Sequence, residues 1–368
     1  MSRVRPLEAA DIDQVAALYL ATFIRRGKSP SEDLIACLGE FYLSGPTVDP
    51  QIPSLVHVNG KGAISGFVGV NVVPMKFSDN RLRAAFGGTL MVRDREQDPM
   101  AGARLLKAFL SGPQDLSLSE TANTTSLEMA KALRGVAFAS YSLEWMRILR
   151  PAAFACDMAL RKSSLRAWAL PAARRLDRLH GWSGYAGARV AKDAAQTAKA
   201  EPVKHVDAEA FAASVEILIS HYQLRPDWPG LQLRHVVREA FEKPLYGQPV
   251  AALVTAPNGS PIGAFLYHLR EGGVGRVLQM LALPGREAKV MDCLLADADR
   301  RGAAGLRGRT HPAFLEAMLG RKMLFANVTN TVAFCRDEAI IDCFRRGQAL
   351  ANGLAGESWG RHIGGNFS

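Results

Sequence analysis

The sequence has little cysteine, and the thiols it has do not form the pattern of a disulfide framework or a zinc site. Five cysteines stand in 368 residues, and no two of them have the CxxC spacing. An odd number of scattered cysteines favours reduced, mostly buried thiols. We therefore expect a protein of a reducing compartment, with no structural disulfide and no metal site.

Long apolar runs are also missing. No segment approaches the ~20 apolar residues that a membrane-spanning helix needs. The opening residues, Met1–Glu8, lack the apolar core of a signal peptide. Both absences predict a cytoplasmic protein.

Several familiar catalytic patterns are absent from the chain. It contains no P-loop and no HExxH pair. It also lacks the HxxxxD pattern of the usual glycerolipid acyltransferases. P-loop nucleotidase and zinc protease chemistry are therefore disfavoured.

Composition and length describe an ordinary globular protein with room for two cores. Hydrophobic residues make up 48% and charged residues 22% of the chain. Single cores rarely grow beyond about 250–300 residues, so this length predicts two domains. The formal net charge of +10 attracts anions such as phosphorylated cofactors, nucleotides or acidic lipid head groups. No nucleic-acid-binding motif accompanies it, so we expect no nucleic acid partner.

An internal repeat organises the chain. Residues 4–12 and 203–211 each predict a short strand with an acidic helix cap, followed by an amphipathic helix pattern. Residues 54–70 and 252–267 each predict a β-hairpin with an Asn-Gly turn.

Each hairpin is followed by a further strand and a helix. The predicted strands are 84–92 and 276–283, and the predicted helices are 100–110 and 287–300. The order strand, helix, hairpin, strand, helix, strand, helix, strand thus occurs twice. We predict two mixed α/β domains, 1–150 and 201–368, each with a mostly antiparallel sheet and one crossover helix.

The segment between them, 151–200, has a different composition. Residues 161–179 are basic with interleaved Leu and Trp, and Pro171 divides them into two helical pieces. Two interpretations stay open: a basic inter-domain helix pair docked on the domains, or a peripheral contact with an anionic membrane. Residues 191–200, rich in Ala and Lys, predict a solvated linker.

The first half contains the parts of an acyl-CoA site. Such a site needs a strand with free backbone groups for pantetheine and a helix N-terminus for the pyrophosphate. Residues 87–92 predict the strand, and residues 93–104 predict the loop that opens the helix. Small residues at 101–103 let phosphate oxygens approach the backbone. The arginines that could add positive charge are Arg93, Arg95 and Arg104.

Residues 97–102 resemble the cofactor loop of the GNAT acyltransferases, whose pattern is Gln or Arg, two residues, Gly, one residue, then Gly or Ala. Gln97 fits the first position and Gly102 the last, while Met100 stands where the middle glycine is usual. A side chain at that position crowds the phosphates or shifts the loop.

The resemblance continues downstream and covers most of residues 4–150. Residues 116–123 look like the fifth GNAT strand with its following Asn, 126–133 like the next helix, and 135–138 like the turn before the sixth strand. It implies acetyl-CoA or another acyl-CoA as co-substrate. The residues it places on that co-substrate are Leu90, Met91, Val92, Gln97, Asp98, Met100, Ala101, Gly102, Ala103 and Arg104.

The resemblance also implies catalytic roles. A GNAT enzyme needs a base for the attacking amine and an acid for the leaving thiolate, and a backbone N–H of the fourth strand polarises the thioester carbonyl. Glu120 is the candidate base, and Asn123 would hold cofactor or water. The tyrosine that often serves as acid is missing. Tyr141 and Ser140, on the predicted next strand, are the candidate substitutes.

The second half is more degenerate. Its counterpart loop, 283–288, is too short for the cofactor pattern, so we expect a structural repeat or a wall of the acceptor groove. The tail 353–362 is either a final strand with a loose end or a surface that faces a sugar or nucleotide through Glu357, Trp359 and Arg361. A second basic cluster comprises Arg307, Arg309 and His311.

The sequence therefore predicts transfer of an acyl group, with acetyl expected, from acyl-CoA to an amine. By analogy with tandem GNAT-like chains, the acceptor would be an amino sugar or a surface-polysaccharide precursor. The alternative is a non-catalytic GNAT-like module that binds a nucleotide or an anionic partner.

Overall fold

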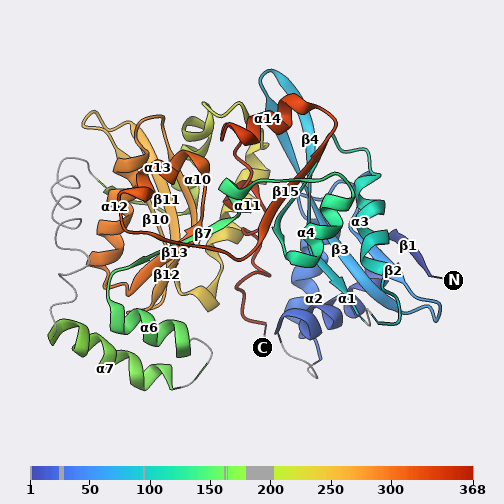
Figure 1. Cartoon of the computed structure of the whole chain (residues 1–368), viewed down its shortest axis with the longest axis horizontal. Helices are drawn as coiled ribbons and strands as arrows, with labels where there is room; N and C mark the ends of the chain where they lie inside the picture. The colour runs from blue at the N-terminus through green and yellow to red at the C-terminus, as the bar shows by residue number, and fades with distance from the viewer. Residues whose placement is uncertain are drawn as a thin grey trace.

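The computed structural model describes residues 2–24, 29–93, 96–160, 163, 165–179 and 203–367. The strands form two mixed sheets that lie side by side, each covered by helices (Figure 1). This is the mixed α/β, mostly antiparallel architecture that the sequence predicts. Arg95 and the predicted linker 191–200 lie outside the described residues.

The first sheet has the strand order β1-β2-β3-β4-β5-β15-β6, and β9 pairs with β3. Its strands are β1 (Arg3–Pro6), β2 (Leu55–Val58), β3 (Ile64–Phe77), β4 (Asn80–Val92), β5 (Leu116–Ala122), β15 (Asn330–Cys335), β6 (Val136–Ala137) and β9 (Leu224–Pro226). Its helices are α1 (Ile12–Tyr19), α2 (Glu32–Gly39), α3 (Ala101–Leu110), α4 (Thr124–Ala132) and the short α5 (Ala139–Ser142). The β2–β3 hairpin is confirmed, and α3 is the crossover that makes β4 and β5 parallel.

The second sheet has the order β14-β7-β13-β12-β11-β10-β8. Its strands are β14 (Leu324–Asn327), β7 (Leu143–Ile148), β13 (Gly305–Arg309), β12 (Val274–Ala282), β11 (Pro261–Leu269), β10 (Gln248–Thr255) and β8 (Val203–His205). Its helices are α10 (Ala208–Ile219), α11 (Gly230–Phe241), α12 (Glu287–Arg300) and α13 (Pro312–Leu319). Helix α14 (Glu338–Arg345) follows β15 and packs on the first sheet, where Phe344 shares an apolar cluster with Phe86 and Leu118. The β10–β11 hairpin and the α12 crossover between parallel β12 and β13 repeat the plan of the first sheet.

The two sheets exchange strands. β15, from the second half of the chain, inserts between β5 and β6 of the first sheet. β7, from the first half, inserts between β13 and β14 of the second sheet. Each sheet therefore contains a strand from the other side of the boundary predicted near residue 150. The domain limits 1–150 and 201–368 stay a prediction.

Helices α6 (Pro151–Leu160) and α7 (Arg166–Leu179) form a hairpin under the second sheet (Figure 1). Asp177 of α7 accepts hydrogen bonds from the N–H groups of Ala152 and Ala153, at distances of 2.9 Å. Asp157 of α6 accepts from the N–H of Val274 on β12 at 2.8 Å. The hairpin is thus docked on the second half. None of the described helices has the length and apolarity to cross a bilayer.

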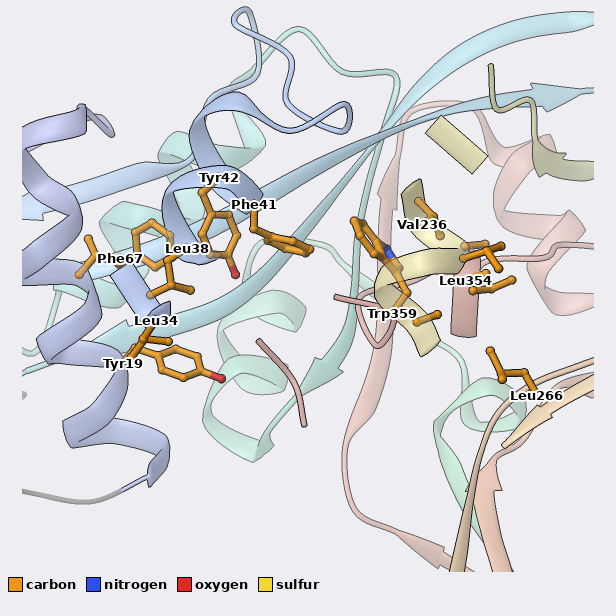
Figure 2. Close-up of a cluster of buried hydrophobic side chains, with 14 of the residues drawn as sticks. Tyr19, Leu34, Leu38, Phe41, Tyr42, Phe67, Val236, Leu266, Leu354 and Trp359 are labelled. Atoms are coloured by element: carbon orange, nitrogen blue, oxygen red, sulfur yellow. The ribbon is translucent and has the colours of Figure 1, made fainter. Parts of the chain in front are cut away.

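The largest hydrophobic cluster runs through both halves. It combines Leu38, Tyr42 and Phe67 of the first half with residues such as Val236 and Leu354 of the second (Figure 2). Phe41 and Trp359 meet across the junction, with ring centroids 4.9 Å apart. Because one apolar core spans the junction, the two halves form one packed body.

Candidate functional site

A slot opens where β4 and β5 separate. The two strands pair only over Ala84–Phe86 and Leu116–Leu118, and beyond these residues they diverge. The divergence leaves a cavity of about 110 Å³, lined by β4 residues such as Leu90, β5 residues such as Ser119, and side chains of α3 and α4. The strand predicted to offer backbone groups to a ligand therefore has an edge that β5 does not cover.

A β-bulge lies on the wall of this slot. Thr89 and Leu90 together oppose the single residue Val68 of β3. Thr89 has φ +52°, a left-handed conformation that is strained for a β-branched residue. Its hydroxyl lies 2.9 Å from the hydroxyl of Tyr42, which helps to hold this conformation. Strain of this kind concentrates at functional sites.

The predicted phosphate loop ends at the N-terminus of α3. The N–H groups of Gly102 and Ala103 have no acceptor among the described residues, as expected for a first helical turn. The Met100 side chain, which stands where the middle glycine is usual, is 58% exposed. Gly102 is buried against Val92 and Met129.

A buried histidine, His57, anchors this loop, and no sequence pattern indicated it. Nε2 of His57, on β2, lies 3.3 Å from the Arg104 guanidinium and 3.5 Å from the Asp98 carboxylate. Asp98 and Arg104 also form an ion pair with each other. Burial lowers the pKa of His57, although Asp98 opposes this effect. Asp98 and Arg104 thus hold the loop on β2. Gln97 and Arg93 are exposed beside it.

A second, larger cavity of about 340 Å³ adjoins the slot. Aromatic side chains line it: Tyr19, Phe23, Phe41, Tyr42 and Tyr246. The two cavities share four residues as walls, so a ligand in one would reach the other at this point: Phe23, Gly88, Thr89 and Thr121.

The carboxyl group of Glu357 lies at the junction of the two cavities. It accepts hydrogen bonds from the Glu120 N–H at 2.6 Å and the Thr121 hydroxyl at 2.7 Å. A Cβ at Gly88 would come within 2.9 Å of this carboxylate, so a larger residue there would have to displace it. Burial, reinforced by the nearby Glu120 carboxylate, raises the pKa of Glu357 to about 7.

Glu120, the base predicted from the sequence, has a different environment. Its carboxylate accepts from the Glu357 N–H at 2.8 Å and faces the Ser358 hydroxyl at 3.3 Å. The Arg309 guanidinium lies 3.7 Å away. Glu120 lines neither the slot nor the aromatic cavity. Its contacts hold the C-terminal tail in place.

The other predicted catalytic residues are divided between the slot and the core. Asn123 lines the slot, and its side chain caps α4 by accepting from the Ser126 N–H at 2.9 Å. Tyr141 is fully buried and donates to the Ala349 carbonyl at 2.8 Å, away from both cavities. Tyr141 and Ser140 belong to the short helix α5, so the strand predicted for them is wrong.

The corresponding slot of the second sheet is filled by the chain itself. β12 and β13 pair over Val274–Val277 and then diverge, as β4 and β5 do. The tail enters this gap: the Leu354 N–H donates to Gln279 at 2.8 Å, and the Asn352 amide donates to the Thr310 carbonyl at 3.0 Å. Within the tail, Trp359 is buried in the core, so it is not free to stack on a ligand. Arg361 pairs with Glu40 and Glu239.

No protein-family model and no curated protein sequence matches the chain. Solved structures do match it. The crystal structure of a GCN5-related N-acetyltransferase from Kribbella flavida aligns over 90% of this chain and 70% of its own, with 12% identity and a TM-score of 0.54. A GCN5-related N-acetyltransferase from Anabaena variabilis aligns over 90% and 72%, with 8% identity and a TM-score of 0.55. These likenesses show that the chain has the fold of the GCN5-related N-acetyltransferases, as the sequence resemblance predicted.

Proposed function

We propose that the protein transfers an acyl group, with acetyl expected, from acyl-CoA to a primary amine. One observation carries the proposal. The slot between β4 and β5 and the aromatic cavity meet at Gly88, Thr89 and Thr121, beside the buried carboxyl group of Glu357. A two-substrate reaction needs two binding sites that meet at one proton-accepting group.

The acyl-CoA would occupy the slot. Its pantetheine amides would pair with the uncovered edge of β4, and its pyrophosphate would accept from the N–H groups of Gly102 and Ala103. The exposed side chain of Met100 leaves this approach open. Leu90, at the bulge, would offer its N–H to the thioester carbonyl.

The amine would occupy the aromatic cavity. Glu357 would take its ammonium proton, because a carboxyl with a pKa of about 7 is poised for this at neutral pH. The amine nitrogen would then attack the thioester carbon, and the carbon–sulfur bond would break. The second proton that the nitrogen loses on becoming an amide would pass to the leaving thiolate through the hydroxyls of Thr89 and Tyr42, which lie 2.9 Å apart, so that Tyr42 ends with its own proton restored.

The aromatic cavity favours an amine on a ring or an apolar body. Aromatic faces attract cations and stack on the apolar faces of rings, and Tyr19, Tyr42 and Tyr246 present such faces together with Glu357. An amino sugar, free or within a surface-polysaccharide precursor, meets this description. We propose it as the first acceptor class to screen.

The test is isothermal titration with acetyl-CoA of the native protein, Ala103→Glu and Ala103→Gln. Glutamate at the first turn of α3 suits the helix dipole, so the fold is retained, but its charge repels the pyrophosphate. Native protein and Ala103→Gln should bind within about threefold of each other. Ala103→Glu should bind at least about tenfold more weakly, roughly 1.4 kcal/mol.

Turnover is measured by release of free CoA thiol in the presence of amino sugars and other primary amines. Release that depends on the amine supports the enzyme. Binding of acetyl-CoA without release under any amine would instead support the binding-module alternative. If native protein that is shown to be folded binds no acyl-CoA, the proposal fails.

A further inference from the structure

A cavity of about 430 Å³ lies on the second half, beside the aromatic cavity but separate from the slot. Three arginines line it, Arg270, Arg276 and Arg307, together with Tyr246 and Asp157. Its volume lies in the range of about 300–1,000 Å³ that small-molecule sites occupy. The acyl-transfer chemistry proposed above uses none of these arginines.

The arginines are arranged in a way that costs folding energy. Arg276 on β12 and Arg307 on β13 are register partners on adjacent strands, so two like charges stand side by side on one face of the sheet. Glu144 lies 3.3 Å from Arg307. No carboxylate among the described residues lies within ion-pair distance of Arg276.

Arg276 is nevertheless held in a fixed position. Its guanidinium carbon lies 4.5 Å from the centroid of the Tyr246 ring. Stacking on an aromatic face orients the guanidinium plane without consuming its N–H donors. Those donors remain for a ligand.

The carboxylate at the far wall does not neutralise the cavity. Asp157 is buried, and it already accepts from Arg166 at 2.5 Å and from the Val274 N–H at 2.8 Å. Arg270 also pairs with it, at 3.9 Å, so this one carboxylate is shared between two arginines, and Arg276 has no share in it. The cavity therefore keeps an excess of positive charge.

We propose that this arginine cavity binds a small molecule that carries a phosphate or carboxylate group. A guanidinium fork matches both oxyanions with paired N–H donors. Arg276 supplies the pre-oriented donors, and Arg307 and Arg270 complete the positive walls. Because Tyr246 also lines the aromatic cavity, the bound anion lies next to the proposed amine acceptor.

Titration calorimetry with pyrophosphate and with citrate tests the proposal, and the two probes separate phosphate from carboxylate recognition. We expect saturable binding of at least one probe and a loss of at least about tenfold in Arg276→Gln. The matched control is Arg234→Gln, an exposed arginine of α11 that is paired with Glu209. It should bind the probe as the native protein does.

Ala103→Glu separates this site from the phosphate loop, because it should leave binding in the arginine cavity unchanged. If Arg276 has a purely structural role, Arg276→Gln should unfold at a lower urea concentration than the native protein. Our proposal predicts equal or greater stability without ligand, because a like-charge contact is removed. The proposal is overturned if neither probe saturates, or if Arg234→Gln and Arg276→Gln weaken binding equally.

Discussion

Two glutamates, 237 positions apart in sequence, exchange hydrogen bonds at the junction of the two cavities. Each carboxylate accepts from the backbone N–H of the other residue. They differ in what else they meet: Glu120 faces Arg309, whereas Glu357 faces the aromatic cavity. This difference supports our proposal that Glu357, and not Glu120, accepts the proton.

Replacement of Glu357 by Gln should therefore remove the proton acceptor. We expect kcat/KM for amine acetylation to fall by about 10²–10⁴-fold, the usual contribution of general base catalysis. In the native enzyme kcat/KM should rise with pH through about 7, as the carboxyl ionises. Glu357→Gln should lack this rise, while the exposed control Glu242→Gln keeps it. Identical pH–rate profiles for all three proteins would rule out this role.

The same carboxyl group should affect stability. Its pKa is raised in the folded state from 4.5 to about 7, so the folded protein holds the proton more tightly than the unfolded chain. The free energy of unfolding should then decrease as pH rises between these values, by about 3 kcal/mol at most. Urea unfolding measures this. The free energy of unfolding of Glu357→Gln, relative to that of the native protein, should be higher at pH 8 than at pH 5.

The buried histidines do not disturb this comparison. Burial lowers the pKa of His268 and of His311 to about 4 and that of His362 to about 3. A lowered histidine pKa makes the free energy of unfolding increase with pH, but the effect is common to both proteins. If the free energies of unfolding of the native protein and Glu357→Gln differ by the same amount at pH 5 and pH 8, the pKa of Glu357 is not raised.

At the scale of helices and strands, local signals decided what the sequence could predict. The Asn-Gly hairpins and the helix 287–300 were predicted correctly, because turn chemistry and periodicity lie within short windows. The exchange of β7 and β15 was not predicted, because edge pairing depends on residues far apart in the chain. The sequence indicated Glu357 as a tail residue that would face a sugar or nucleotide, but its place beside β5 was not predicted for the same reason, since its partner Glu120 is far away in the chain.

Helix α7 carries an apolar stripe that faces solvent. Trp168 is 85% and Leu179 is 84% exposed, and Leu165 and Leu176 continue the stripe at helical spacing. The opposite side buries Leu170 and Asp177, and Arg175 and Arg178 flank the stripe. An exposed apolar stripe with basic flanks is typical of helices that lie on anionic membranes. Peripheral membrane contact through 161–179 stays a prediction that this geometry supports.

Vesicle sedimentation tests it. The native protein should pellet with vesicles containing phosphatidylglycerol, should not pellet with phosphatidylcholine alone, and should be released by high salt. Trp168→Ser should lose most of the binding. Leu231→Ser, which changes an 80% exposed leucine on α11, is the matched control and should bind as the native protein does. Equal binding by all three proteins, or none by the native chain, would exclude this use of α7.

At the scale of the whole molecule, the second half completes the first. It provides β15 to the first sheet, Glu357 to the junction, and Trp359 to the shared core. The slot of the second sheet holds the segment that positions Glu357, since Leu354 is bonded to Gln279 there. The second half therefore acts as a scaffold for the first. It does so through contacts between residues of the two halves.

A fragment of residues 1–150 should consequently fail to fold alone. It lacks β15, so β5 and β6 lose their shared neighbour, and it carries β7 without β13 or β14 to pair with. Unpaired strand edges and a halved core favour aggregation.

The full chain should unfold in one cooperative transition, seen as coincident urea curves by tryptophan fluorescence and circular dichroism. Adding the separately expressed 151–368 fragment should restore soluble, acetyl-CoA-binding protein in part. A soluble 1–150 fragment with native-like circular dichroism, or two separated transitions in the full chain, would show that strand exchange does not couple the halves.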